Sequence, residues 1–216
     1  MNLDIISQII TAVVEGESEQ IVEFTRQALT AGVEPMTIID QGLIPGMDIV
    51  GEKFASGEYF LPNLIISANG MQDSMRILEP ELRARQQTRK SAGRVVIGTV
   101  QGDIHEIGKS LVGTMLSANG FEVHDLGVDV PVADFITKIR ETDANLVGLS
   151  ALLTTTMVVQ REVIIALKQA GLRDRVKVMV GGAPVTRTWA EDIGADGYAE
   201  DAIGAVALAK KLSATA

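Results

Sequence analysis

From about residue 93 onward, short runs rich in β-branched residues alternate with longer stretches of helical spacing. Strands are expected over 95–100, 122–126, 146–149, 177–180 and, more briefly, 197–199, and helices are expected to begin near residues 107, 132, 157, 188 and 202. Strict alternation of this kind favours a parallel sheet covered on both faces, with right-handed crossovers. It predicts an α/β domain built on a doubly wound five-stranded parallel sheet of the flavodoxin/Rossmann-like kind.

The part of the chain before this alternation has apolar residues at three- and four-residue spacing, interrupted by glycine and proline. This pattern predicts a helical bundle, with helices over 5–14, over 18–31, from 35 to 56 with an interruption at Pro45-Gly46, and from Leu61 onward. The polar run over 83–91 is expected to be a linker or a frayed helix end. We therefore predict two domains, a helical bundle over 1–88 and the α/β domain over 89–216.

The composition argues against several classes of function. A net charge of -9 disfavours nucleic acid as a partner, because binding to phosphates needs clustered Lys and Arg. The chain has no cysteine, which excludes disulfides, thiolate metal sites and cysteine nucleophiles. The first residues do not form a signal-peptide pattern, and no apolar run is long enough to cross a bilayer. We therefore expect a cytoplasmic protein without a membrane partner.

Polar and glycine-rich segments follow three of the expected strands. The first strand leads into Asp103 and His105, the third into the segment 150–156, and the fourth into Gly181-Gly182. In a parallel sheet these loops open at one edge, beyond the carboxyl ends of the strands, where ligands bind. A carboxylate that holds one ring nitrogen of a histidine fixes its tautomer and raises its basicity, which is how metal-binding imidazoles are supported. Asp103 is the natural partner for His105.

Each of these features also has a purely structural explanation. His105 would be a helix cap or a surface residue, Ser150 a strand-end hydroxyl that caps the next helix, and Gly181-Gly182 a tight turn. The three threonines at 154–156 would cap the helix that follows. His124 lies within the second strand pattern and is expected to be a sheet residue rather than a ligand. The first loop lacks the G-x-G-x-x-G spacing, which disfavours a flavin or nicotinamide site.

Taken together, the three loops resemble the signature of cobalamin-binding domains that hold the corrinoid base-off. The matching residues, in this order, are Asp103-x-His105-x-x-Gly108, Ser150-x-Leu152 and Gly181-Gly182. The segment 58–62, followed by a helix rich in alanine and methionine, is similar to the cap module of methyl-transferring corrinoid proteins. The resemblance covers nearly the whole chain. It extends to corrinoid proteins of methanol, methylamine, betaine or methoxy-aromatic methyltransferase systems and to modules of cobalamin-dependent methionine synthase.

The resemblance implies roles for individual residues. His105 would be the lower ligand of cobalt, Asp103 would hydrogen-bond the imidazole, and Thr156 would extend that relay, so these three are the expected catalytic residues. The expected cofactor contacts are the cap residues Phe60 and Met71 over the upper face, the loop residues Gly102, Asp103, Ile104, His105, Glu106, Ile107, Gly108, Gly181 and Gly182, and the residues Ser150, Leu152 and Thr154 around the nucleotide tail.

The function implied is that of a methyl carrier and not of a complete enzyme. The corrinoid protein would carry a methyl group on cobalt from a substrate-specific methyltransferase to a second methyltransferase with a thiol or tetrahydrofolate acceptor. A reductive activase is a further expected partner. The methyl donor, the acceptor, the lower base of the corrinoid and the oligomeric state stay open. The alternatives are a cobalamin-dependent sensor or regulator, the small subunit of an adenosylcobalamin mutase, which generally lacks the cap, and a flavodoxin-like module without a corrinoid.

Overall fold

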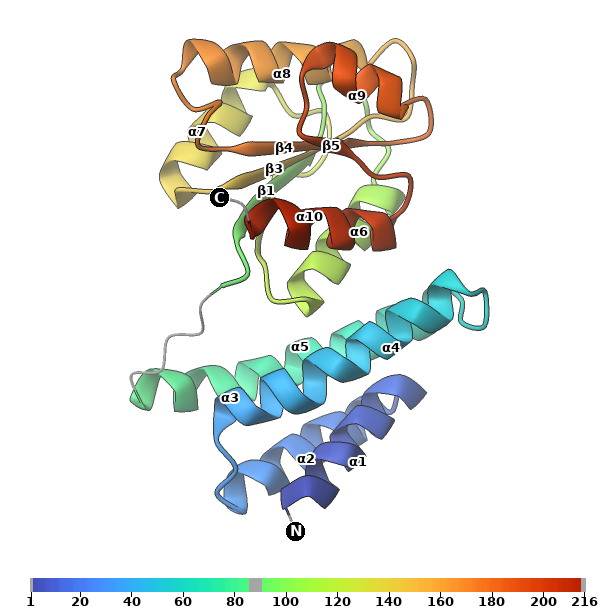
Figure 1. Cartoon of the computed structure of the whole chain (residues 1–216), viewed down its shortest axis with the longest axis vertical. Coiled ribbons are helices and arrows are strands. Elements are labelled where there is room, and N and C mark those ends of the chain that lie inside the picture. Colours follow the sequence, from blue (N-terminus) through green and yellow to red (C-terminus); the bar gives the residue numbers. More distant parts are fainter. Residues whose placement is uncertain (1, 86–90, 215–216) are drawn as a thin grey trace. The chain divides into compact units, whose positions relative to one another are not determined.

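The computed structural model describes residues 2–85 and 91–214 (Figure 1). The chain divides into two compact units, Met1–Lys90 and Ser91–Ala216, and each is described by itself. The boundary predicted between 88 and 89, and most of the predicted linker, fall among residues 86–90, outside the described residues. None of the helices in the described ranges combines the length and the apolar character needed to span a membrane.

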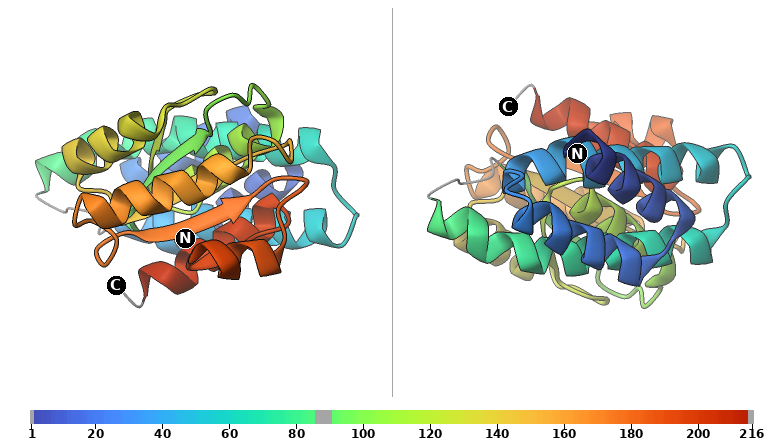
Figure 2. Two further views of the ribbon diagram at one scale, coloured as in Figure 1. Left: turned by 90° about the horizontal axis from the view of Figure 1, so that it is seen from above. Right: turned by 90° about the horizontal axis from the view of Figure 1, so that it is seen from below.

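The first unit is helical, as predicted. Helices α1 and α2 pack side by side, as the right-hand view of Figure 2 shows, and α5 packs against α2 while α4 packs against α1. The apolar face of each helix supplies the core, which is the reason for the three- and four-residue spacing in the sequence. The elements are α1 (Asn2–Glu15), α2 (Ser18–Thr30), α3 (Pro35–Ile38), the π-helical turn η1 (Ile39–Leu43), α4 (Ile44–Ala55) and α5 (Leu61–Ala84).

The predicted interruption at Pro45-Gly46 is wrong in its position, because α4 continues through both residues. The irregularity is one turn earlier, in the π-helical segment η1, where the amide of Ile44 donates to the carbonyl oxygen of Ile39. A wide turn there accommodates the ring of Pro45, which has no amide hydrogen to donate. Gly46 allows a close approach of helices, since a Cβ atom at this position would lie 2.7 Å from the Cβ of Val13 in α1.

The second unit is a doubly wound sheet of five parallel strands in the order β2-β1-β3-β4-β5, which confirms the predicted fold class. Helices α7, α8 and α9 cover one face, and α6 and α10 cover the other (Figure 1). The strands are β1 (Arg94–Thr99), β2 (Glu122–Asp125), β3 (Leu146–Ser150), β4 (Lys177–Gly181) and β5 (Gly197–Tyr198); the helices are α6 (Ile107–Ala118), α7 (Val132–Thr142), α8 (Val158–Gln169), α9 (Arg187–Ile193) and α10 (Ala202–Ser213).

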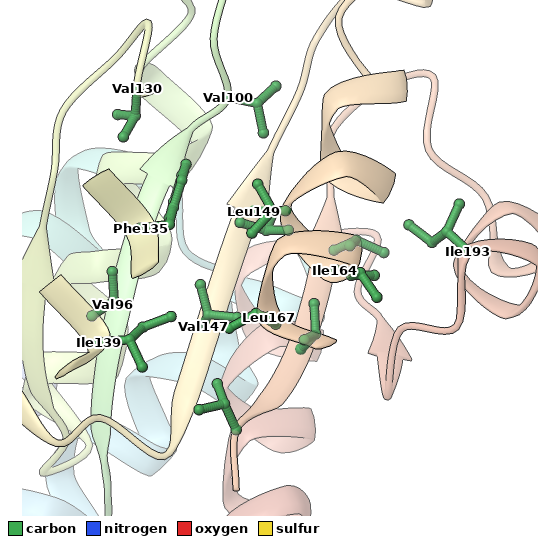
Figure 3. Packing of buried hydrophobic residues seen from close by; sticks show 14 of the residues in the cluster. Val96, Val100, Val130, Phe135, Ile139, Val147, Leu149, Ile164, Leu167 and Ile193 are labelled. Atoms are coloured by element: carbon green, nitrogen blue, oxygen red, sulfur yellow. The ribbon is translucent and has the colours of Figure 1, made fainter. Parts of the chain in front are cut away.

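The predicted strands and helices of this unit are present, with ends that differ by about one residue, which is the usual uncertainty of element boundaries. Val100, predicted as the last residue of the first strand, instead forms an isolated bridge with Val130. In the left-hand view of Figure 2, seen from above, α8 lies over the sheet. The apolar core between the sheet and helices α7 to α9, drawn in Figure 3, includes Phe135, Leu149 and Leu167.

The ends of three neighbouring strands are in register at the carboxyl edge of the sheet. Thr99 of β1 pairs with Ser150 of β3, and Ser150 pairs with Gly181 of β4. Three loops therefore start next to one another. They are the first loop, after β1, which carries Asp103; the third loop, which follows Ser150 at the end of β3; and the fourth loop, after β4, which carries Gly182. This is the edge at which parallel α/β sheets bind ligands.

Candidate functional site

The carboxylate of Asp103 joins the first loop to the third. Its Oδ1 is 2.7 Å from Nδ1 of His105 and accepts the backbone amide of the same residue at 3.1 Å. Its Oδ2 accepts the amides of Leu152 at 2.7 Å and Leu153 at 3.3 Å, and the hydroxyl of Thr156 at 2.7 Å. Asp103 is fully buried, so these contacts replace all of its hydration. The predicted pairing of Asp103 with His105 is thus present, within a larger network.

This network keeps Asp103 ionised. Burial by itself raises the pKa of Asp103, but the hydrogen bonds from Thr156, from the amide of Leu152 and from His105 outweigh burial and hold the pKa below its ordinary value. An ionised carboxylate can only accept, so Nδ1 of His105 carries a proton, and Nε2 is the ring nitrogen that could bind a metal. The side chain of His105 is 46% exposed, which makes that nitrogen available to a ligand.

The explanation as a helix cap does not describe what is found for His105 or for the threonines at 154–156. Helix α6 has Glu106 at its N-cap and α8 has Met157, and neither helix has a side-chain cap bond there. The hydroxyl of Thr156 donates to Asp103, whereas a capping hydroxyl would accept a backbone amide at the start of α8. His105 and Thr156 therefore belong to the Asp103 network. His124 lies in β2, with Nε2 at 3.2 Å from Glu122, as expected of a sheet residue.

Gly181 and Gly182 differ in the atoms that lie close to them. Gly182 has φ +117°, and a Cβ atom there would lie 1.8 Å from the carbonyl oxygen of Ala151. Glycine is required at 182 because the third and fourth loops touch there, so this glycine has a structural role. At Gly181 the nearest atom to such a Cβ would be the carbonyl oxygen of Ala199, at 3.1 Å. Ser150, the partner of Gly181 in the sheet, is half-buried at the end of β3.

Large aliphatic side chains are exposed around His105. Ile104 is 74% exposed and Ile107 81% exposed, and Leu152 and Leu153 on the third loop are exposed too. Exposed apolar side chains gathered at a ligand-binding edge favour a ligand with a broad apolar face. A half-exposed imidazole with one free nitrogen, set among them, suits a metal carried by such a ligand.

The other predicted site residues are less closely connected. Gly102 begins the first loop with φ +84°, and Glu106 lies 3.6 Å from the buried amine of Lys109. Thr154 is exposed in the turn before α8, and Gly108 lies in the first turn of α6. In the helical unit, Phe60 is 69% exposed, whereas Met71 is 1% exposed.

Three side chains that hold the loops were not predicted from the sequence. Thr99 donates its hydroxyl to the carbonyl oxygen of His105 at 2.8 Å. Asp129, between β2 and α7, hydrogen-bonds the first loop. Gln160 of α8 is buried, and its amide donates to the carbonyl oxygens of Leu149 at 3.0 Å and Gly181 at 3.2 Å. Asp129 could have been found from the sequence, because it also lies beyond the carboxyl end of an expected strand.

Replacing Gln160 with leucine is expected to lower the free energy of unfolding by about 2 kcal/mol, because the carbonyl oxygens of Leu149 and Gly181 each lose one donor and the indole N–H of Trp189, 3.0 Å from Oε1, loses its acceptor. Urea unfolding followed by fluorescence measures this, since Trp189 is the sole tryptophan and belongs to the α/β unit. The matched control is Gln169→Leu at the exposed end of α8, for which we expect little change. Equal losses in both variants would contradict the assigned role of Gln160.

Comparison with known proteins identifies the family. Residues 93–207 match a family model described as the B12 binding domain, and residues 5–79 match a second model with the same description. The chain is 50% identical to dimethylamine corrinoid protein 3 of Methanosarcina acetivorans, over 96% of both chains. It is 47% identical to the trimethylamine corrinoid protein of Methanosarcina barkeri, over 96% of this chain and 95% of that one.

A solved structure agrees with these matches. The methanol:cobalamin methyltransferase complex MtaBC from Methanosarcina barkeri is similar with a TM-score of 0.88 and 33% identity, over 99% of this chain and 81% of the matched chain. The exposed imidazole beside a carboxylate and the apolar rim at the sheet edge fit a corrinoid. The chain therefore belongs to the family of B12-binding corrinoid proteins, and its cofactor is a corrinoid.

Proposed function

We propose that this chain is a methyl carrier in which His105 is the lower ligand of the corrinoid cobalt. The observation that carries the proposal is the 2.7 Å contact between Nδ1 of His105 and the buried carboxylate of Asp103, which leaves Nε2 for the metal. When bound, the corrinoid supplies a cobalt centre that accepts a methyl group and gives it up again. The chain itself supplies ligation, orientation and shielding.

The residues at the sheet edge divide this work. Asp103 fixes the tautomer and the direction of the His105 ring, and Thr156 holds the second oxygen of that carboxylate. Because the carboxylate is buried and fully hydrogen-bonded, the ring is held before the cofactor arrives, and the cost of ordering it is already met in folding. Ile104 and Ile107 are exposed beside His105 and would provide apolar surface that excludes water from a bound corrinoid.

The remaining expected cofactor contacts complete the proposed site. Ser150, Leu152 and Thr154 would contact the nucleotide tail, with the small residues Gly108 and Gly181 leaving room for it. Phe60, whose side chain is exposed on the helical unit, would shield the upper side. The burial of Met71 supports a role in the helical core instead of a direct contact.

We propose a methylated amine as the methyl source. Identity is 50% to a dimethylamine corrinoid protein and 47% to a trimethylamine corrinoid protein, but 33% to the matched chain of the methanol complex. The proposed partners are a methylamine methyltransferase that delivers the methyl group, a second methyltransferase that passes it to a thiol or to tetrahydrofolate, and a reductive activase.

The decisive variant for ligation is His105→Ala. In the 15N-labelled protein reconstituted with unlabelled cob(II)alamin, electron paramagnetic resonance of the parent chain should show splitting by one 15N nucleus of the protein, which the corrinoid's own 14N base cannot give, and this splitting should be absent in the variant. His124→Ala is the matched control, because it removes the second of the two histidines, in β2. If the His105 variant kept the splitting, histidine ligation at this position would be wrong.

Methyl transfer is tested by mixing reduced, corrinoid-loaded protein with a methylamine methyltransferase and mono-, di- or trimethylamine. We expect a change in the corrinoid absorption spectrum that depends on both the enzyme and the amine, and methylation of a thiol once the second methyltransferase is added. Failure with every amine, together with a light-dependent change of oligomeric state, would favour a sensor instead of a carrier.

A further inference from the structure

Asp129 lies in the connection between β2 and α7, at the carboxyl edge of the sheet, with φ +52°. In the described part of the chain, Asp129 and Asp143 are the non-glycine residues with positive φ. A left-handed backbone conformation is uncommon outside glycine, although aspartate tolerates it better than most residues. Such a conformation at a ligand-binding edge points to a constraint from its surroundings.

The constraint at Asp129 is a pair of hydrogen bonds in opposite directions with the first loop. Its Oδ1 accepts the backbone amide of Gly102 at 2.6 Å. Its own amide donates to the carbonyl oxygen of Asp103 at 2.8 Å. Asp129 therefore holds Gly102 through its side chain and Asp103 through its backbone. These two residues immediately precede Ile104 and His105.

The segment around Asp129 is itself fastened to β1. The amide of Thr99 donates to the carbonyl oxygen of Gly127, and the amide of Val130 donates to the carbonyl oxygen of Thr99, both at 3.0 Å. The bonds to Gly102 and Asp103 thus connect the loop to a rigid support. The hydroxyl of Thr99 holds the far side of the loop at the carbonyl oxygen of His105. The loop is held at both ends, and Asp129 provides the end nearest Asp103.

We propose that Asp129 is a positioning residue for the His105 ligand, which acts through the backbone of Gly102 and Asp103 without touching the cofactor. The proposal rests on the proposed ligation by His105. A loop held at both ends presents the imidazole in one orientation, whereas a loop that has lost one anchor samples others and binds a metal less often. Asp103 fastens the same loop to the third loop, whereas Asp129 fastens it to the segment beside β1, so the two anchors act from different sides.

The two roles of Asp129, its acceptor oxygen and its backbone conformation, are separated by two substitutions. Asp129→Gly removes the acceptor but suits the positive φ, so the loop loses its side-chain anchor without backbone strain. Asp129→Asn keeps an acceptor oxygen and tolerates the same conformation. Asp143→Gly is the matched control, because Asp143 also has positive φ (50°) and makes side-chain ion pairs, but it lies at the end of α7, next to Arg94 at the start of β1.

The measurement is the ratio of imidazole-bound to imidazole-free cobalt in the 15N-labelled full chain loaded with unlabelled cob(II)alamin, taken from the 15N splitting in electron paramagnetic resonance. We expect Asp129→Gly to lower this ratio about fivefold, the effect of one lost hydrogen bond. Asp129→Asn and Asp143→Gly should both stay close to the parent chain. Urea unfolding of each variant without cofactor, followed by Trp189 fluorescence, shows whether the α/β unit is still folded.

The outcomes separate this inference from the proposed ligation. If His105→Ala abolishes the splitting and Asp129→Gly leaves it unchanged, His105 is the ligand and the role of Asp129 is wrong. If His105→Ala leaves the splitting unchanged, the ligation itself is wrong. If Asp129→Gly and Asp143→Gly lower the ratio equally, the effect is one of general stability, and the positioning role is overturned.

Discussion

Replacing Gly182 with alanine should lower the free energy of unfolding of the α/β unit by about 4 kcal/mol. A Cβ atom at this position would lie 1.8 Å from the carbonyl oxygen of Ala151 and 2.7 Å from its carbonyl carbon, and the backbone has φ +117°. These neighbours are backbone atoms, so they cannot rotate away as a flexible side chain would. Either the third and fourth loops separate, or the residue changes its conformation.

Urea unfolding with Trp189 fluorescence measures this change, and Gly181→Ala is the matched control. At Gly181 an added Cβ atom would approach the carbonyl oxygen of Ala199 at 3.1 Å, without positive φ, so we expect a loss of about 1 kcal/mol. Corrinoid binding should weaken in the Gly182 variant, because displacement of Ala151 also moves the amide of Leu152 that supports Asp103. Equal stability of the two variants would contradict this close approach of the loops.

The second large effect is expected for Asp103→Asn, which should lower the free energy of unfolding by about 3 kcal/mol and weaken ligation by His105 about 10- to 100-fold. Each of the two carboxylate oxygens faces hydrogen-bond donors. One oxygen faces His105, and the other faces Leu152, Leu153 and Thr156. An asparagine has a single oxygen, so its NH₂ group must face donors on one of the two sides.

Both orientations of that amide are unfavourable. With the NH₂ group toward His105, Nδ1 must become an acceptor, which moves the ring proton to Nε2 and blocks the nitrogen that would bind cobalt. With the NH₂ group toward the third loop, the amide of Leu152 is left buried and unpaired. Ligation is measured by the nitrogen splitting with cob(II)alamin, and stability by urea unfolding.

Thr156→Ser is the control for this prediction. It keeps the hydroxyl that donates to Asp103 and removes one methyl group, so ligation should stay close to that of the parent chain. If Asp103→Asn bound the imidazole as well as the parent chain does, the carboxylate would have no role in selecting the tautomer. In that case Asp103 would serve only to connect the loops.

The sequence alone determined the fold class, the order of the elements and the edge that carries the site. Periodicity is local, so the alternation of buried strands with amphipathic helices is visible residue by residue, and parallel strands necessarily place the loops after β1, β3 and β4 at one edge. The pairing of Asp103 with His105 was predictable for the same reason, because only one residue separates them along the chain.

The tertiary structure decided which distant groups meet at that edge. The bonds from Leu152 and Thr156 to Asp103 span 49 and 53 residues, and that from Gly102 to Asp129 spans 27. No local pattern encodes such contacts, because they depend on how far each loop extends and on the register of the strands below it. The same holds for Gly182, whose need for glycine comes from the backbone of Ala151 in another loop. Residue types and spacing predicted a histidine supported by a carboxylate, and three-dimensional packing decided what supports the carboxylate.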